Sequence, residues 1–407
     1  MTRAGVFSCG GETPAMLSNR DAMLAITLTS GLGPRLTQRC LMQFQSAQAV
    51  LEASASDLAT IEGVGTYRAD EIRRNLDKVI SGSALERENA LIAEHNVSIV
   101  TVIDDDYPKL LRHISDPPPL LYVRGRLIAD DVVALGVVGS RHCTQYGREQ
   151  ADRLAGLCAQ HGLTIVSGGA KGIDGAAHRA ALTAKGRTIA VIGSGLTRPY
   201  PPDHVELFDQ IAQSADVDDG NSRGAVISEL PMTTPPKAEN FPSRNRIISG
   251  MSLGVLVVEA AVRSGALITA RLCIEDHNRD LMAVPGRIDS PYSAGCNKII
   301  REGWATLVTC SADILDALGE TGQLLKAGLD ASELRQRDRE AKPPAAVPAS
   351  ANVSQTQKQL LGALTGPRTL DELITAAELP IAVVQADLTM LEIRSMIKRD
   401  QGRYIRV

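Results

Sequence analysis

The sequence predicts an α/β protein built around a doubly wound, mostly parallel sheet, with a helical domain before it and a winged-helix domain after it. Three observations lead to this prediction. Short aliphatic runs alternate with helical segments through the middle of the chain, a helical pattern without such runs precedes them, and a second helical pattern follows a polar stretch rich in Pro and Ala. With 407 residues, the chain is long enough for about three domains.

These changes of pattern set the expected domain boundaries. We expect a flexible N-terminus over residues 1–17, a helical domain over 18–90, the sheet domain over 97–320, a linker over 330–353 and the winged helix over 354–407. The linker is predicted from its polar composition and its prolines, which favour a chain without packed structure.

The helical domain carries two Gly-x-Gly turns, at residues 31–33 and 63–65. The second turn resembles that of a helix-hairpin-helix or SAM-like unit, in which glycines let backbone N–H groups at a helix start approach a DNA phosphate. The alternative is that the glycines only close a turn between packed helices. Glu62 beside the second turn, with few cations nearby, favours this alternative.

Seven runs in the middle of the chain are predicted to be buried parallel strands, because they are apolar on both faces and are separated by helical crossovers. Most of them are followed by glycine-rich loops, which is where sheets of this kind bind ligands. The runs are 97–102, 132–138, 163–166, 188–192, 225–227, 254–258 and 281–284.

The first of these loops is Gly139-Ser140-Arg141. Its small residues admit close approach by an anion, and the guanidinium of Arg141 suits a phosphate. The second, from Ser167 to Asp174, places Gly168, Gly169 and Lys171 between a strand and a helix start, which favours an anion-binding nest. Asp174 could act there or serve only as a helix cap, and His178 is more consistent with a packed histidine than with a catalytic base.

A third cluster, Phe241-Pro242-Ser243-Arg244-Asn245-Arg246, combines two guanidinium groups, an amide and an aromatic ring. Such groups bind phosphates, base edges and base faces, respectively. The alternative is a surface loop capped onto a helix. Two further loops contribute Ser264, in the stretch Arg263 to Ala270, and Asn297, after the glycine turn at 284–286.

Several other classes of protein lose support. No stretch matches the phosphate-binding loop Gly-x4-Gly-Lys-Ser/Thr, and Arg198 replaces the third glycine of a dinucleotide-binding Gly-x-Gly-x-x-Gly.

Seven scattered cysteines without a Cys-x-x-Cys pair indicate reduced thiols, and neither a metal nor a cofactor is expected. The absence of a secretory pattern or a long apolar run predicts a soluble, cytoplasmic protein. The net charge of −4 requires any basic surface to be local.

The C-terminal region is predicted to hold three helices followed by a strand pair that turns at Gln401-Gly402. Thr369 and Glu372 form a capping-box pattern at the second helix. Asp387 and Glu392 on the third helix argue against reading of a DNA major groove by that helix, and favour a protein or self contact. The helices are expected at 356–364, 369–377 and 381–395 and the strand pair at 397–407.

Taken in order, five motifs closely resemble the DNA-processing protein A (DprA/Smf) family over about half the chain, from residue 107 to 303. They are Gly-Ser-Arg at 139–141, Ser-Gly-Gly-Ala-x-Gly-Ile-Asp at 167–174, Phe-Pro-x-Arg-Asn-Arg at 241–246, Arg-Ser-Gly-Ala-Leu-x-Thr-Ala at 263–270 and Val-Pro-Gly at 284–286. The acidic stretch 214–224 departs from the family pattern.

The resemblance implies a Rossmann-like domain that binds single-stranded DNA in a basic pocket and forms a homodimer. It further implies a non-enzymatic mediator that protects incoming DNA and helps to load a RecA-type recombinase during natural transformation, with a single-strand-binding protein as a further partner. Carried onto matching positions, the expected DNA contacts are Ser140, Arg141, Gly168, Gly169, Lys171, Arg244, Asn245, Arg246, Ser264 and Asn297.

One rival interpretation is a DNA-uptake scaffold or regulator that acts mainly through the winged helix. The stronger rival is a nucleotide-processing enzyme similar to the Rossmann-like phosphoribohydrolases. Those enzymes also combine Gly-Ser-Arg with a Ser-Gly-Gly nest, but they carry Pro-Gly-Gly-x-Gly-Thr-x-x-Glu as a catalytic loop. The comparable stretch here, 263–270, has no glutamate after its threonine. The sequence therefore favours DNA binding over hydrolysis.

Overall fold

The computed structural model describes residues 17–213, 224–327 and 354–406, apart from 365, 367, 378, 394–396 and 401–402. The chain divides into two compact units, one ending at Ala327 and the other beginning at Gly328. The expected flexible start, the linker at 330–353 and the acidic stretch fall almost wholly outside the described residues. Within the described part, no helix is long and apolar enough to cross a membrane.

The first unit is organised around a nine-stranded sheet with the order β1-β2-β6-β5-β4-β3-β7-β8-β9. The seven strands from β3 to β9 pair with one another in parallel, whereas β1 pairs with β2 and β2 with β6 in antiparallel fashion. The strands are β1 Ser98–Thr101, β2 Leu120–Gly125, β3 Ala134–Val138, β4 Thr164–Ser167, β5 Thr188–Val191, β6 Gly224–Ser228, β7 Gly254–Val257, β8 Asp280–Ala283 and β9 Thr306–Leu307.

The predicted fold class is confirmed, with one correction. The run at 97–102 forms β1 as predicted, but this strand is antiparallel at the sheet edge and not a buried parallel strand. Its partner β2 was not predicted. β1 and β2 form this edge of the sheet, because β2 pairs with β6, the outermost parallel strand on this side.

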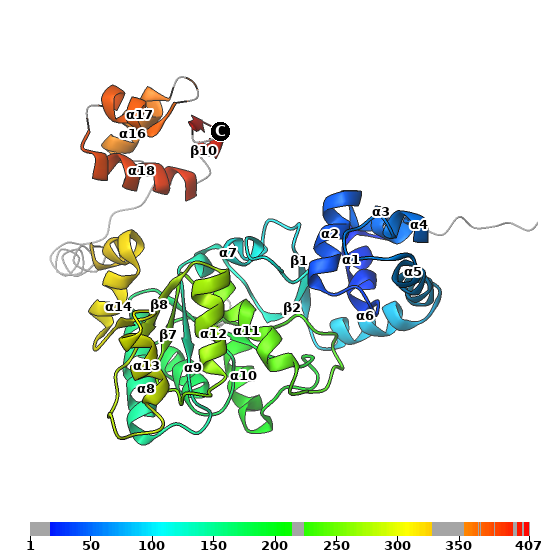
Figure 1. Cartoon of the computed structure of the whole chain (residues 1–407), viewed down its shortest axis with the longest axis horizontal. Helices are drawn as coiled ribbons and strands as arrows, with labels where there is room; N and C mark the ends of the chain where they lie inside the picture. Colours follow the sequence, from blue (N-terminus) through cyan, green and yellow to red (C-terminus); the bar gives the residue numbers. More distant parts are fainter. Residues whose placement is uncertain are drawn as a thin grey trace, which may run out of the picture. The chain divides into compact units, whose positions relative to one another are not determined.

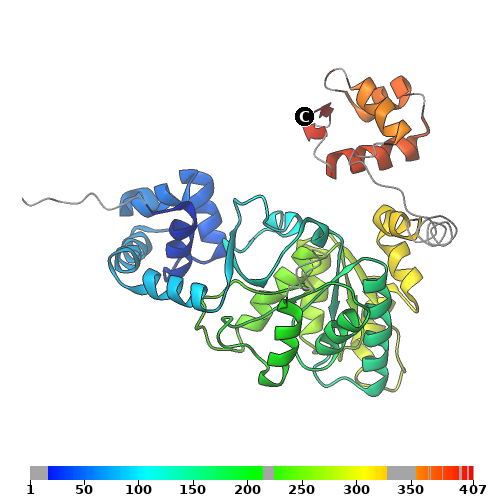
Figure 2. The same ribbon diagram turned by 180° about the vertical axis from the view of Figure 1, so that it is seen from behind.

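Helices cover both faces of the sheet (Figures 1 and 2). Along β5, Ile189 and Val191 face the layer that contains α11, while Ala190 and Ile192 face the opposite layer. Two-sided burial explains why these strands are continuous apolar runs. The helices of this part are α7 Lys109–Arg112, α8 Gln145–Gln160, α9 Ile173–Thr183, α10 Val205–Ala212, α11 Asn240–Met251, α12 Ala266–Arg271, α13 Ala294–Arg301 and α14 Ser311–Ala317.

The order of the strands creates a reversal point. From β3 the chain builds β4, β5 and β6 on one side and then returns to build β7, β8 and β9 on the other. The loops that follow β3 and β7 therefore leave the sheet in opposite directions and open a crevice between them. This crevice holds the candidate site.

The N-terminal helices pack against the edge of the sheet that carries β1 and β2 (Figure 1). Leu24, Ile26 and Leu76 from these helices share a hydrophobic core with Tyr122 of β2 and Phe208 of α10. The helical segment therefore belongs to the same compact unit as the sheet. Its helices are α1 Asn19–Leu28, α2 Pro34–Phe44, α3 Ala47–Glu52, α4 Ala55–Leu58, α5 Thr66–Ser81 and α6 Ala84–Glu94.

The second unit has the predicted outline of a winged helix. The side chain of Glu372 accepts a hydrogen bond from the Thr369 amide at 2.8 Å, and the Glu372 amide donates to Thr369 Oγ1 at 3.4 Å, which forms the expected capping box. Asp387 accepts a hydrogen bond from Gln357 within the unit. The elements are α16 Gln355–Ala363, α17 Leu370–Ala377, α18 Ile381–Ile393, β10 Ile397–Asp400 and β11 Arg403–Arg406.

Candidate nucleic-acid interface

A pocket of about 530 Å³ lies at the carboxyl ends of β3, β4 and β7. It occupies the reversal point of the strand order, which is the expected place for a ligand in a sheet of this type. The residues that line it include Arg141, Asp174, Tyr200, Phe241 and Arg244.

The loops after β3 and β7 are fastened to each other beside this pocket. The amide of Ser140 donates to the carbonyl oxygen of Glu259 at 2.7 Å. The buried carboxylate of Glu259 accepts hydrogen bonds from the Thr144 amide at 2.7 Å and from Thr144 Oγ1 at 2.8 Å. Thr144 is the N-cap of α8, so Glu259 fixes the start of that helix against β7. The carboxylate of Glu259 therefore has a structural role.

Arg141 is the exposed cation of the pocket. Its guanidinium carbon lies 4.8 Å from the ring centroid of Phe241, a cation–π arrangement. Phe241 in turn lies 5.7 Å from Tyr200 between ring centroids, at an interplanar angle of 55°. Arg141 forms no ion pair with any residue that the structure describes. The pocket therefore presents one unpaired guanidinium next to two aromatic rings.

Arg244 forms the buried base of the pocket and is only 4% exposed. It donates hydrogen bonds to the carbonyl oxygens of Gly168, at 2.6 Å, and of Val191. Burial lowers the pKa of Arg244 to about 10, and the nearby carboxyl of Asp174 opposes this shift. Arg244 is therefore still charged at neutral pH, and its Nε–H has no hydrogen-bond partner in the described part of the chain.

Asp174, in the first turn of α9, is the acidic group of the pocket. Burial raises its pKa to about 6, although the charge of Arg244 and a hydrogen bond from the Ala170 amide lower it. The charge of the pocket therefore changes as the pH passes through about 6. His178, further along α9, is fully buried and shares a 2.7 Å hydrogen bond with Thr188, as expected for a packed histidine.

The glycines after β4 are required by packing. A Cβ on Gly168 would lie 2.5 Å from a guanidinium nitrogen of Arg244 and 2.6 Å from a carboxylate oxygen of Asp174. Gly169 has φ +66°, and a Cβ there would lie 2.6 Å from the ring of Phe208. The loop thus lets Arg244 and Asp174 approach each other beneath the pocket.

Asn245 and Ser264 line the pocket with Arg141 and Arg244. Ser264 also accepts a 3.3 Å hydrogen bond from the Ala266 amide at the start of α12. The segment that carries Asn245 is not a loop but helix α11. Pro242 is compatible with this because it stands in the first turn of the helix, where no intrahelical N–H bond is required.

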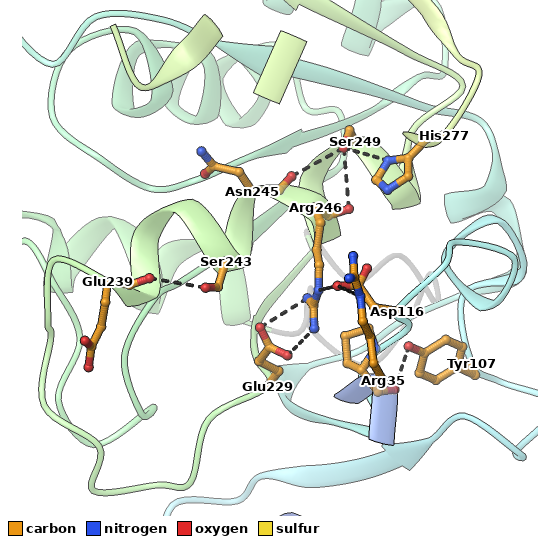
Figure 3. A network of polar contacts seen from close by, with 11 residues as sticks. Arg35, Tyr107, Asp116, Glu229, Glu239, Ser243, Asn245, Arg246, Ser249 and His277 are labelled. Carbon is orange, nitrogen blue, oxygen red and sulfur yellow. Dashed lines mark hydrogen bonds and ion pairs between the residues drawn. The ribbon is translucent and has the colours of Figure 1, made fainter. Parts of the chain in front are cut away.

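Four of the ten predicted residues line the pocket, and the loop residues Ser140, Gly168 and Gly169 are not among its lining residues. The other three lie away from it. The ammonium group of Lys171 pairs with Asp203 and lines a neighbouring hollow of about 480 Å³. Asn297 holds Gly286 through two hydrogen bonds, of 3.1 and 3.0 Å. Arg246 lies on the side of α11 away from Asn245, as Figure 3 shows, and is directed toward two carboxylates.

The carboxylates around Arg246 are those of Glu229, at 2.6 Å, and Asp116, at 3.2 Å. Arg246 is 6% exposed, and the two acids raise its pKa against the effect of burial. Its charge is thus compensated inside the protein. The structure brings Arg244 and Arg246 to different sides of α11 and does not join them in one site.

Tyr200 was not singled out from the sequence. It stands between two prolines beyond the carboxyl end of β5, in Pro199-Tyr200-Pro201, and is 40% exposed. An aromatic residue held between prolines after a buried strand was the available signal, because it places a ring at the ligand-binding edge of the sheet. No cluster of potential metal ligands occurs among residues 17–213, 224–327 and the described part of 354–406.

Comparison with known proteins identifies the family. Residues 98–319 match the sequence profile of DNA recombination-mediator protein A, and residues 342–403 match that of the DprA winged helix domain. The first match alone spans more than half of the chain. The chain belongs to the DNA recombination-mediator protein A family. The resemblance predicted from the five motifs is therefore confirmed.

Individual members of the DprA family resemble the chain over much of its length. It is 34% identical to Protein Smf of Synechocystis over 96% of the chain and 99% of that protein. It is 38% identical to the DNA processing protein DprA of Bacillus subtilis over 58% of the chain and 76% of that protein. The crystal structure of DprA from Streptococcus pneumoniae matches with a TM-score of 0.62 and 35% identity, over 74% of this chain and 98% of that one.

Proposed function

We propose that the pocket at the ends of β3, β4 and β7 binds single-stranded DNA. The observation that carries this proposal is the unpaired Arg141 guanidinium beside the rings of Phe241 and Tyr200, above the buried charge of Arg244. Single strands are held by cations that contact phosphates and by aromatic rings on which bases stack. The names of the relatives, which describe DNA-processing proteins, support the same conclusion.

We further infer that the chain is a recombination mediator without catalytic activity. In this proposal it protects incoming DNA and helps to load a RecA-type recombinase in natural transformation, acting as a homodimer in the cytoplasm and in contact with a single-strand-binding protein. The family profile, which describes a recombination mediator, supports this role. A strand-exchange assay tests it: the wild type should relieve inhibition of the recombinase by single-strand-binding protein, whereas Arg141→Ala should not.

The direct test of DNA binding uses Arg141 and not the two buried arginines of α11. In fluorescence anisotropy, Arg141→Ala should weaken binding of a labelled single strand about tenfold, as expected for loss of one charge-assisted phosphate contact. It should also reduce the slope of log affinity against log salt by about 0.7. Arg301→Ala, which removes an exposed arginine of α13 outside the pocket, is the matched control. Equal loss in both variants would refute the assignment.

One observation favours a second candidate, a nucleotide-processing hydrolase. Asp174 is a buried pocket carboxyl with a pKa of about 6, which would suit a general acid or base. Against it, Glu259 is engaged with Thr144, and the stretch 263–270 lacks the glutamate of the phosphoribohydrolases. Release of free base from a nucleoside monophosphate, lost in Asp174→Asn, would support hydrolysis. Absence of release together with strand binding would leave the mediator as the function.

A further inference from the structure

A second hollow, of about 600 Å³, lies on the other side of α11 from the pocket. We call it the helical groove, because the N-terminal helices form one of its walls. That wall contributes Arg35 and Arg39 from α2 and Arg68 from α5, and the opposite wall contributes Asn240 and Ser243 from the start of α11. The groove is therefore built by residues that are far apart in the sequence.

Each acid of the groove is paired with an arginine, and the side chains of the outer arginines are exposed to solvent. Glu229 and Asp116 face the buried guanidinium of Arg246. Arg35 lies 3.7 Å from Asp116 with a side chain that is 74% exposed. A pair this open to solvent contributes little, so its guanidinium can bind another anion at small cost. Figure 3 shows the guanidinium of Arg35 next to Asp116.

Arg39 and Arg68 stand beside the second glycine turn. Arg39 donates a 2.6 Å hydrogen bond to the carbonyl oxygen of Glu62 and lies 3.5 Å from its carboxylate, which is 86% exposed. Arg68 is exposed and forms no ion pair with a described residue. Gly63 has φ +83°, and a Cβ there would lie 3.3 Å from the guanidinium of Arg39, so the turn itself makes room for that side chain. Few nearby cations were expected at this turn, but the fold supplies Arg39 from α2.

The first turn of α5 adds two features that suit a nucleic acid. Its N-cap, Gly65, has no side chain to cap the helix, so the first backbone N–H groups are open to an anion. Tyr67, which precedes the groove residue Arg68 in the chain, is 80% exposed but is not itself among the residues that line the groove. The guanidinium of Arg68 is exposed and donates only a long hydrogen bond, of 3.5 Å, to the carbonyl oxygen of Gly63. A large exposed ring beside such a guanidinium gives a base a face to stack on while a phosphate is held.

The helical groove and the pocket share a wall. Phe241, Arg244 and Asn245 line the pocket, while Asn240, Ser243 and Arg246 line the groove, and all six belong to the first two turns of α11. A DNA single strand that leaves the pocket therefore needs to cross only the start of α11. Arg244 is the one charged residue from Asn240 to Asn245, and the exposed Glu239 just before the helix lies 3.9 Å from the ammonium group of Lys237.

We propose that the helical groove is a second phosphate-binding surface for the same single-stranded DNA, with Arg35, Arg39 and Arg68 as its phosphate contacts and Tyr67 as its stacking ring. This inference rests on the proposed function of the pocket. It predicts that short strands occupy the pocket alone, whereas longer strands also occupy the groove and bind more tightly.

A series of oligothymidylates of increasing length tests this with the full chain. For the wild type, affinity should rise in a second step once the strand is long enough to cross α11. In the double variant Arg39→Ala/Arg68→Ala this step should disappear, so that long strands bind about tenfold more weakly than to the wild type, and the salt slope for long strands should fall by about 1.4. Binding of the shortest strands should be unchanged.

The matched control is Arg74→Ala/Arg87→Ala, which removes the same charge from exposed arginines of α5 and α6 that do not line the groove. Arg68→Glu offers a second variant that disturbs no ion pair of the described residues. Wild-type behaviour of both groove variants with long strands would overturn this inference and leave the pocket intact. Failure of the wild type to bind even long strands would overturn the proposed function itself.

Discussion

The two sides of helix α11 hold their arginines in opposite ways. On the pocket side, Arg244 is held by the carbonyl oxygens of Gly168 and Val191, and its acidic neighbour Asp174 has a raised pKa of about 6. On the other side, Arg246 meets the carboxylates of Glu229 and Asp116. Carbonyl oxygens orient a guanidinium without cancelling its charge, whereas two carboxylates cancel it. A positive electrostatic potential is therefore expected at the pocket. On the other side of α11, the ion pairs of Arg246 have a structural role.

The comparison predicts that the largest effect on stability comes from Arg246. In Arg246→Ala, the carboxylates of Glu229 and Asp116, which are 12% and 20% exposed, lose their shared cation, and we expect a loss of about 3–5 kcal/mol in the free energy of unfolding. Urea unfolding followed by circular dichroism measures this. The control Arg35→Ala removes the exposed partner of Asp116 and should cost less than about 1 kcal/mol. Similar losses in both variants would show that Arg246 is not the centre of the network.

Phe241 provides the next largest effect, on DNA binding. Phe241→Leu removes the ring that faces Arg141 and Tyr200 while keeping an apolar side chain at the start of α11. Loss of one stacking platform should weaken single-strand binding by about 1–3 kcal/mol, with little change in the salt slope. Anisotropy titrations at two salt concentrations measure both quantities. Tyr292→Leu, at an exposed ring elsewhere, should bind as the wild type does.

Asp174 gives the smallest predicted effect, a dependence on pH. Its folded-state pKa of about 6 lies above the usual value because of burial, so the carboxyl gains a proton as the pH falls from 7 to 5. The pocket then loses one negative charge, and affinity for single-stranded DNA should rise severalfold over this interval. Asp174→Asn is the control, because it should bind at pH 7 as tightly as the wild type does at pH 5.

The fold was easier to predict from the sequence than the site was. The parallel strands were recognisable because both faces are buried and the runs are therefore apolar throughout. β2 was missed because its antiparallel pairing with β1 and β6 depends on residues distant in sequence. β9 has only two residues, both exposed, and leaves no apolar run.

The site depended on geometry that motif spacing does not contain. Arg244, Asn245 and Arg246 were treated as one cluster, but residues two apart on a helix point in nearly opposite directions. Lys171 and Asn297 follow the correct strands, yet Asp203 and Gly286 engage their side chains. Placement of a loop at the binding edge was predictable, whereas the partner of each side chain was not. The DNA contacts themselves stay a prediction.

Photo-crosslinking tests the central claim most directly. A single strand that contains iododeoxyuridine is irradiated with the full chain, and the attached peptides are identified by mass spectrometry. We predict attachment at Phe241 and Tyr200, which line the pocket, and loss of that attachment when unlabelled single strand competes. Attachment confined to the winged helix, or to parts of the sheet domain outside the pocket and the helical groove, would contradict the account.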